Sequence, residues 1–117
     1  MIHLLPDSFA AESVTPYDEA VARLASIRAA LTVAEQAAGS SAPLPEPQMP
    51  AAWPEASAAK RRCFETRSVE SAQAASAGLE MLAAQRAAGL KPNPQAIGRL
   101  AETLRTELAD LDRLFSL

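Results

Sequence analysis

Apolar residues recur at helical spacing along most of this 117-residue chain. In residues 16–38 they alternate steps of three and four, at Tyr17, Ala20, Leu24, Ile27, Leu31, Ala34 and Ala38, and so share one stripe of a helix. Residues 94–115 carry a broader apolar face, made of Ile97, Leu100, Ala101, Leu104, Leu108, Leu111, Leu114 and Phe115. With a long alanine-rich helix over 54–88 between them, the pattern predicts an all-α fold. We expect a three-helix bundle that forms a single helical domain, 1–117.

Proline and glycine mark the ends of these helices. Thr15 before Pro16 predicts a capped start for the first helix, and Gly39 predicts its end. Gly89 stops the second helix, and the third begins directly after Asn93. Because so short a connection leaves little room to turn, we expect helices 54–88 and 94–115 to form an antiparallel hairpin.

The connection 39–53 is rich in proline and is predicted to be neither helix nor central strand. Extended proline-rich chain rises about 3.1 Å per residue, so this crossover is long enough to follow a whole helix. The first helix is therefore compatible with either direction relative to the second. Leu44, Met49 and Trp53 are the expected anchors of the crossover. The stretch 43–47 also fits a ligand for a polyproline-binding domain.

Residues 1–15 precede the first helix and contain Ile2, Leu4, Leu5 and Phe9. We expect this stretch to form an N-terminal lid or arm that lies on the domain. A docking peptide for another protein is the alternative.

The middle helix has a contact seam of small side chains. Steps of three and four along it give Ser68, Ser71, Ala75, Gly78 and Leu82. Small residues let a facing helix approach closely, so that leucines from the other helices fill the space. Glycine inside a helix costs about 0.5–1 kcal/mol relative to alanine. We therefore expect a bulky group to pass at Gly78.

Composition limits the partners and the location. A net charge of −3 and a pI near 5.1 argue against binding to phosphate backbones, so no nucleic acid is expected. No apolar run approaches the roughly 20 residues of a membrane span, and the first residues lack the basic start of a signal peptide. The single cysteine suits a reducing compartment. We expect a cytoplasmic protein, and the heavy use of alanine and proline favours a bacterium.

Candidates for chemistry are few. His3 is the only histidine and lies outside the predicted helices, which excludes histidine clusters and also excludes a catalytic triad unless His3 folds in. Cys63 stands beside Arg61 and Arg62 but has no partner cysteine, so we expect a half-buried packing residue. No glycine-rich phosphate loop is present. The sequence predicts no catalytic residues, no cofactor, no metal and no enzyme.

The basic run Lys60, Arg61 and Arg62, with Phe64 beside it, is the predicted partner-binding site. An acidic protein segment or a phosphate group would suit these cations. The alternative is that the arginines serve only as helix salt bridges with Glu65.

The expected function is a non-enzymatic helical protein–protein interaction module, like an adaptor, chaperone or assembly factor. A homo-oligomer is expected, because the helix 54–88 outruns the others and would leave its end, around Lys60 to Phe64, uncovered. The alternative is a small dimeric transcriptional or nucleoid-associated regulator, similar to an antitoxin. That alternative requires basic residues gathered on one face of the dimer.

Overall fold

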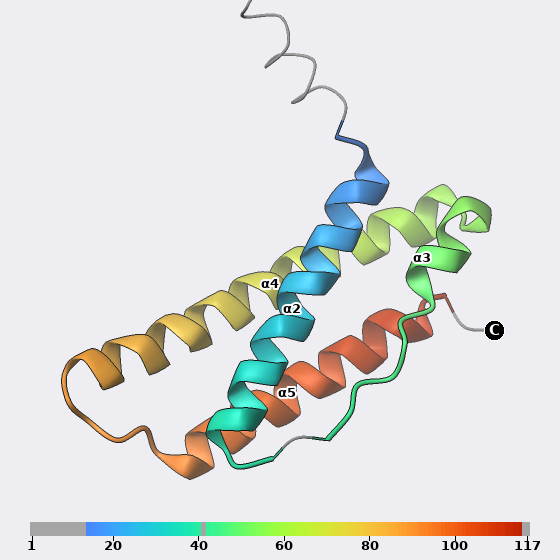
Figure 1. The fold of residues 1–117 in the computed structure, drawn as a ribbon. Helices are drawn as coiled ribbons and strands as arrows, with labels where there is room; N and C mark the ends of the chain where they lie inside the picture. The colour runs from blue at the N-terminus through green and yellow to red at the C-terminus, as the bar shows by residue number, and fades with distance from the viewer. Residues whose placement is uncertain (1–13, 41, 116–117) are drawn as a thin grey trace, which may run out of the picture.

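The structure is a computed structural model that describes residues 14–40 and 42–115 (Figure 1). Its elements are α2 (Pro16–Ala37), α3 (Met49–Ala52), the 3-10 helix η1 (Trp53–Glu55), α4 (Ala58–Ala87) and α5 (Pro94–Arg113). The two described ranges contain no strand, and the predicted all-α class is confirmed. Most of the predicted N-terminal lid or arm, 1–15, lies outside the described residues, as does His3.

Helix α2 is fixed by its two ends. Thr15 Oγ1 accepts a hydrogen bond from the Asp18 amide at 3.1 Å, and Asp18 Oδ2 accepts one from the Thr15 amide at 3.2 Å. This reciprocal capping box satisfies donors that a helix start leaves free, and confirms the predicted start. At the other end Gly39 has φ +81°, and the Ser40 amide donates to the Glu35 carbonyl at 2.7 Å. This Schellman arrangement ends α2 one residue before the predicted boundary.

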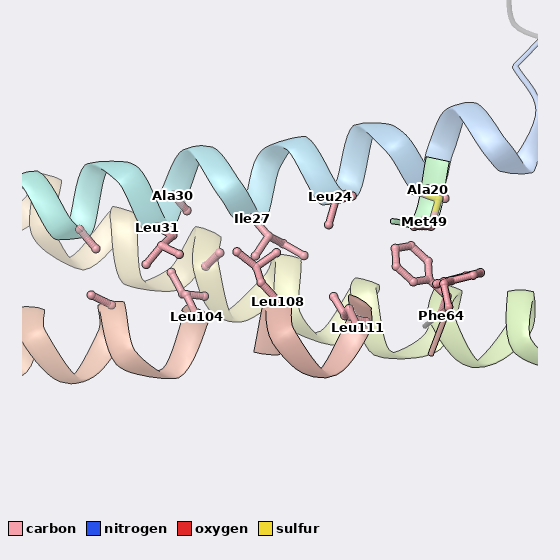
Figure 2. Close-up of a cluster of buried hydrophobic side chains, with 14 of the residues drawn as sticks. Ala20, Leu24, Ile27, Ala30, Leu31, Met49, Phe64, Leu104, Leu108 and Leu111 are labelled. Carbon is pink, nitrogen blue, oxygen red and sulfur yellow. The ribbon is translucent and has the colours of Figure 1, made fainter. Parts of the chain in front are cut away.

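The three long helices pack on one another, with α2 and α4 running in one general direction and α5 running back (Figures 1 and 2). Residues 42–48, which we call the strap, make this parallel arrangement possible. The strap returns from the end of α2 toward its start, because the Gln48 amide donates to Asp112 Oδ1 near the end of α5 at 2.7 Å. The direction left open by the sequence is therefore parallel for α2 and α4.

Two predicted boundaries are wrong. The middle helix was expected from residue 54, but α4 begins at Ala58 after Ala56, whose backbone is extended with ψ 144°. Ser57 caps it, since its side chain accepts from the Lys60 amide at 3.1 Å. A serine cap outweighs a proline three residues earlier, because the serine satisfies a free amide. At the chain's end, α5 stops at Arg113 instead of residue 115.

The expectation that residues 39–53 contain no helix is also wrong. Met49–Ala52 forms one turn of α-helix, and η1 follows from Trp53. Pro50 and Pro54 both stand in the first turn of their short helices, where a missing N–H breaks no hydrogen bond. Burial explains the folding of this segment: Met49 and Trp53 are both in the core, as predicted for anchors, and Leu44 packs against it.

The core lies mainly between α2 and α5 (Figure 2). Ile27 and Leu31 of α2 meet Leu104, Leu108 and Leu111 of α5, and all five are buried. Helix α4 adds small buried side chains over most of its length. Each of those buries little apolar area, so leucines and isoleucine from the two other helices supply most of the apolar packing.

Gly78 of α4 faces Leu100 of α5. A methyl group added to Gly78 would lie 2.7 Å from Leu100 Cδ2 and 2.8 Å from Leu100 Cδ1, well inside van der Waals contact. Leu100 therefore occupies the space that the side chain of any other residue at position 78 would need. In contrast, a methyl group on Gly98 of α5 would meet nothing within 4 Å.

These two glycines give a matched test of close approach. Gly98→Ala should raise the free energy of unfolding by about 0.5–1 kcal/mol, because alanine is the better helix former. Gly78→Ala should gain less or lose stability, and Gly78→Leu should lose about 1–3 kcal/mol through overpacking. Urea denaturation measures all three. Equal effects of alanine at both positions, or small equal losses for Gly78→Ala and Gly78→Leu, would refute the close contact.

Candidate functional site

An aromatic cluster covers one end of the helices. Its members are Tyr17, Trp53, Phe64 and Phe115. The rings of Phe64 and Phe115 have centroids 5.4 Å apart in an edge arrangement, and Trp53 lies 6.2 Å from Phe64 and 6.1 Å from Phe115. Tyr17, in the first turn of α2, lies 6.2 Å from Trp53. The cluster joins α2, η1 and α4 to Phe115, which follows α5, and such ring pairs contribute about 0.5–1.5 kcal/mol each beyond the effect of their buried area.

Side chains of α2 and α5 hold the strap by its backbone. Arg28 Nη1 donates to the Pro45 carbonyl at 2.8 Å, and Arg105 Nη2 approaches the Ala42 carbonyl at 3.4 Å. With the bond from the Gln48 amide to Asp112, the strap is attached at three points along its length. Proline has no backbone N–H, so the proline-rich strap cannot pair with a neighbouring strand. Its carbonyl groups accept hydrogen bonds from arginine guanidinium groups instead.

The strongest polar contact joins α2 to α5. Arg105 donates from Nε at 3.1 Å and from Nη2 at 2.6 Å to the same oxygen, Oε2 of Glu35. The Glu35 side chain is only 10% exposed and that of Arg105 is 38% exposed. Glu35 stands in the last turn of α2, which carries no basic residue of its own. Arg105 therefore supplies the positive charge that the carboxylate and the helix C-terminus both favour.

Beneath the strap lies a pocket of about 330 Å³ between α2 and α5, which we call the strap pocket. Apolar lining residues come from the strap, from α3 and from all three long helices, and include Leu24, Leu44, Met49, Phe64, Leu108 and Ala109. Five charged residues also line it: Arg28, Glu46, Arg105, Asp112 and Arg113. Because Ala109 and Glu46 are exposed, the pocket opens at the surface. Its volume is at the low end of the ~300–1,000 Å³ of ligand sites.

The predicted partner-binding residues are not gathered on one surface. Phe64 is 0% exposed within the aromatic cluster, so its side chain cannot meet a partner at the surface. Arg61 donates from Nη2 to the carbonyls of Trp53 at 2.8 Å and Pro54 at 3.0 Å, and its guanidinium lies 5.3 Å above the Trp53 ring. Arg61 thus satisfies two carbonyl groups of η1 by hydrogen bonding. Lys60 is partly buried, and Arg62 is exposed.

The predicted uncovered end of the middle helix is covered only in part. Arg61 is held by η1 and Phe64 packs on Trp53 and Phe115, whereas Arg62 and Cys63 are exposed. The less covered part is the opposite end of α4, where Met81 is 58% exposed, and the following Leu90 is 61% exposed.

The predicted helix seam lies on the side of α4 that faces the other helices. Ser68, Ser71, Ala75 and Leu82 are buried, and Gly78 is partly buried against Leu100. Ser68 Oγ accepts a hydrogen bond from Arg23 Nε of α2 at 2.9 Å and donates to the Glu65 carbonyl at 3.1 Å. The hydroxyl is therefore satisfied although the side chain is fully buried.

The remaining chemical candidates stay apart. Cys63 is exposed on α4, so its prediction as a half-buried packing residue is wrong. Among the residues that the structure describes, no three His, Cys, Asp or Glu side chains are grouped so that they could hold a metal ion. None of the described helices is both long enough and apolar enough to cross a membrane.

The strap pocket itself was not found from the sequence. Its signal was present in the predicted anchors Leu44 and Met49, since anchors on a crossover imply a surface beneath it. The direction of α2 relative to α4 was open, so it was not possible to say which residues of α2 and α5 would face the strap.

Comparison with protein-family models, with curated proteins and with solved structures finds no match to this chain.

The Glu35–Arg105 pair predicts a clear mutational contrast. Arg105→Met should lower the free energy of unfolding by about 1–3 kcal/mol, because it leaves a largely buried carboxylate without its donor. Arg99→Met, an exposed site in the same helix, should change it by less than about 0.5 kcal/mol. Adding Glu35→Gln to Arg105→Met should recover part of the loss. Chemical denaturation measures each variant, and equal losses for Arg105→Met and Arg99→Met would contradict the pairing.

Proposed function

We propose that this chain is a non-enzymatic helical module that binds another protein, in the manner of an adaptor, chaperone or assembly factor. The observation that carries the proposal is the strap pocket. It presents an apolar lining to the surface in a protein whose other large apolar side chains are mostly buried. Apolar pockets that accept one or two anchoring side chains are where binding energy concentrates in protein interfaces.

The charges around the pocket suggest the chemistry of the partner. The lining contains three arginines, Arg28, Arg105 and Arg113, and two acidic residues, Glu46 and Asp112. Asp112 already accepts a hydrogen bond from the Gln48 amide. All three arginines already have a contact within the protein: Arg28 holds the strap, Arg105 pairs with Glu35, and Arg113 pairs with Asp110. Arginine held in place loses less side-chain entropy when it binds a carboxylate. We propose a partner segment in which large apolar residues alternate with acidic ones.

We propose further that residues 1–117 form one domain in which α2, α4 and α5 make a three-helix bundle, and that it works in the cytoplasm of a bacterium. Contacts of all three helix pairs support the bundle. The single cysteine and the heavy use of alanine support the location only in a general way. The net charge of −3 supports a protein rather than a nucleic acid as partner.

Filling the pocket tests the function. Ala109→Trp places a large ring at an exposed pocket position, and Ala25→Trp makes the same change at an exposed position of α2 that does not line the pocket. In affinity purification from the native host, wild-type protein and Ala25→Trp should retain the same co-eluting protein, and Ala109→Trp should lose most of it. Circular dichroism checks that both variants fold. Equal recovery with both would refute the pocket as the binding site.

Self-association is a separate proposal, supported by the open end of α4. Met81 lies beside Gly78, Leu82, Ile97 and Leu100 around a small groove of about 100 Å³. Apolar surface of this kind is reduced when two copies pack together.

The proposed contact predicts that wild-type protein is larger than a monomer in light scattering at high concentration. Met81→Glu should shift it toward the monomer, because a charge would be buried in the contact. Val33→Glu, at an exposed apolar site on α2, is the control and should leave the size unchanged. A monomeric wild type would contradict self-association.

A further inference from the structure

The strap forms one wall of the strap pocket, with residues 44–47 in the lining. Three hydrogen bonds attach it to α2 and α5: Arg28 to the Pro45 carbonyl, Arg105 to the Ala42 carbonyl, and the Gln48 amide to Asp112. All three bonds lie at exposed groups. Water can therefore replace each of them when the strap moves away from the helices, so each bond adds only a little to the stability of the closed position.

The side chains of the strap give it little hold on the core. Leu44 and Pro47 are partly buried, and the other strap residues are exposed. Burial rises sharply at the next residue, since Met49 is only 1% exposed. Segments with few buried apolar contacts and with exposed hydrogen bonds open at a lower free energy than the core does. Met49 therefore marks the end of the loosely held segment.

Proline makes this segment stiff. Pro43, Pro45 and Pro47 each fix their own φ angle, and each biases the residue before it toward an extended conformation. A chain with so few backbone states does not loosen one residue at a time. Release of one attachment therefore loosens the whole strap.

The strap is fixed at both ends but has length to spare. At one end the Ser40 amide donates to the Glu35 carbonyl, and at the other Gln48 is held by Asp112. The extended chain between Ser40 and Gln48 spans about 25 Å.

The distance that this chain has to cover is shorter. Leu111, next to Asp112, lies opposite Leu24 of α2, which stands about 16 Å from Glu35 along the helix axis (Figure 2). Crossing from α2 to α5 adds about 8–10 Å sideways, which makes a straight path of about 18–19 Å. The strap therefore has enough length to move outward while both of its ends stay attached.

We propose that the strap is a gate, which opens outward as one unit between Ser40 and Met49 while α2, α4 and α5 stay packed. Opening uncovers the pocket lining of α2 and α5, where Leu24 and Leu108 lie, and admits a partner side chain from the side of the strap. As the entrance to a binding site, the gate rests on the proposed function of the pocket. The opening itself does not, and it is tested without any partner.

Amide hydrogen exchange of the full chain, followed by nuclear magnetic resonance, tests whether the strap moves as one unit. Arg28→Met removes the hydrogen bond to Pro45 and leaves the bond of Gln48 in place. In a strap that opens as a unit, the Gln48 amide should then exchange about five- to tenfold faster, which is the usual weight of one hydrogen bond. Arg99→Met, at an exposed position of α5, should leave the Gln48 rate unchanged. A Gln48 rate that Arg28→Met does not alter would overturn the gate.

Urea separates opening of the strap from unfolding of the whole chain. Opening exposes little surface, so the exchange rate of the Gln48 amide should hardly change at low urea concentrations. The amide of Leu31, a fully buried residue of α2, should exchange faster as urea rises, because only global unfolding exposes it. Gln48 exchange that rises with urea as steeply as that of Leu31 would overturn the gate, since the strap would then open only together with the core.

Thiol labelling tests whether the strap closes the pocket. Cys63→Ser removes the exposed native thiol, and in that background Leu108→Cys places a thiol in the pocket lining. Adding Arg28→Met should speed its reaction with a neutral maleimide by the same factor as Gln48 exchange. Leu104→Cys, one turn away in the core, should react at a rate that rises with urea, as unfolding requires. Equal rates for Leu108→Cys with and without Arg28→Met would overturn the gate.

Failure of the gate is distinct from failure of the function. The exchange measurements need neither a partner nor a core substitution, so they decide on the opening even where Leu108→Cys does not fold. A Gln48 rate unaffected by Arg28→Met, together with loss of the co-eluting protein in Ala109→Trp, keeps the function and removes the gate. A strap that opens, together with equal recovery for Ala109→Trp and Ala25→Trp, keeps the opening and removes the function.

Discussion

The structure depends on how closely α4 is approached by its neighbours. Ser68, Ser71 and Ala75 are buried yet small, and at Gly78 the side chain of Leu100 comes within 2.7 Å of where a methyl group would stand. Helix α4 therefore provides a narrow surface on which the other helices pack closely, but it buries little apolar volume itself. The leucines between α2 and α5 supply the larger part of the buried apolar surface (Figure 2). Since helices this close tolerate little change in side-chain volume, the seam sets how the three helices meet.

Parallel packing of α2 and α4 creates a second requirement, which is a long return connection (Figure 1). The proline-rich strap meets it, but its carbonyls need donors from elsewhere. Arg28 and Arg105 provide them, and Arg105 also neutralises Glu35 at the end of α2. Because the strap is held by its backbone at separate points and not packed along its whole length, a pocket remains beneath it. The proposed binding site is thus a consequence of the topology.

Much of the fold was accessible from the sequence because helix periodicity and end signals are local. The start of α2 at the Thr15 cap and the apolar face of α5 followed from such patterns. The start of α4 did not, because Ser57 and Pro54 are competing start signals. Ser57 caps α4, and Pro54 stands in the first turn of η1 instead. Tertiary contacts also change the surroundings of the predicted partner-binding residues. From the sequence alone, a basic run with a phenylalanine suggests an exposed surface. In the structure, tertiary contacts bury Phe64, and Arg61 donates to the Trp53 carbonyl.

The central claim is that neighbouring helices approach α4 closely, most of all at Gly78. Nuclear Overhauser contacts in the full chain measure this most directly, because they report pairs of protons that lie close together in solution. The account predicts cross-peaks from the α-protons of Gly78 to the methyl groups of Leu100, since a methyl group added to Gly78 would lie 2.7 Å from Leu100 Cδ2. Methyl groups of Leu100 that show no contact with Gly78 would contradict it.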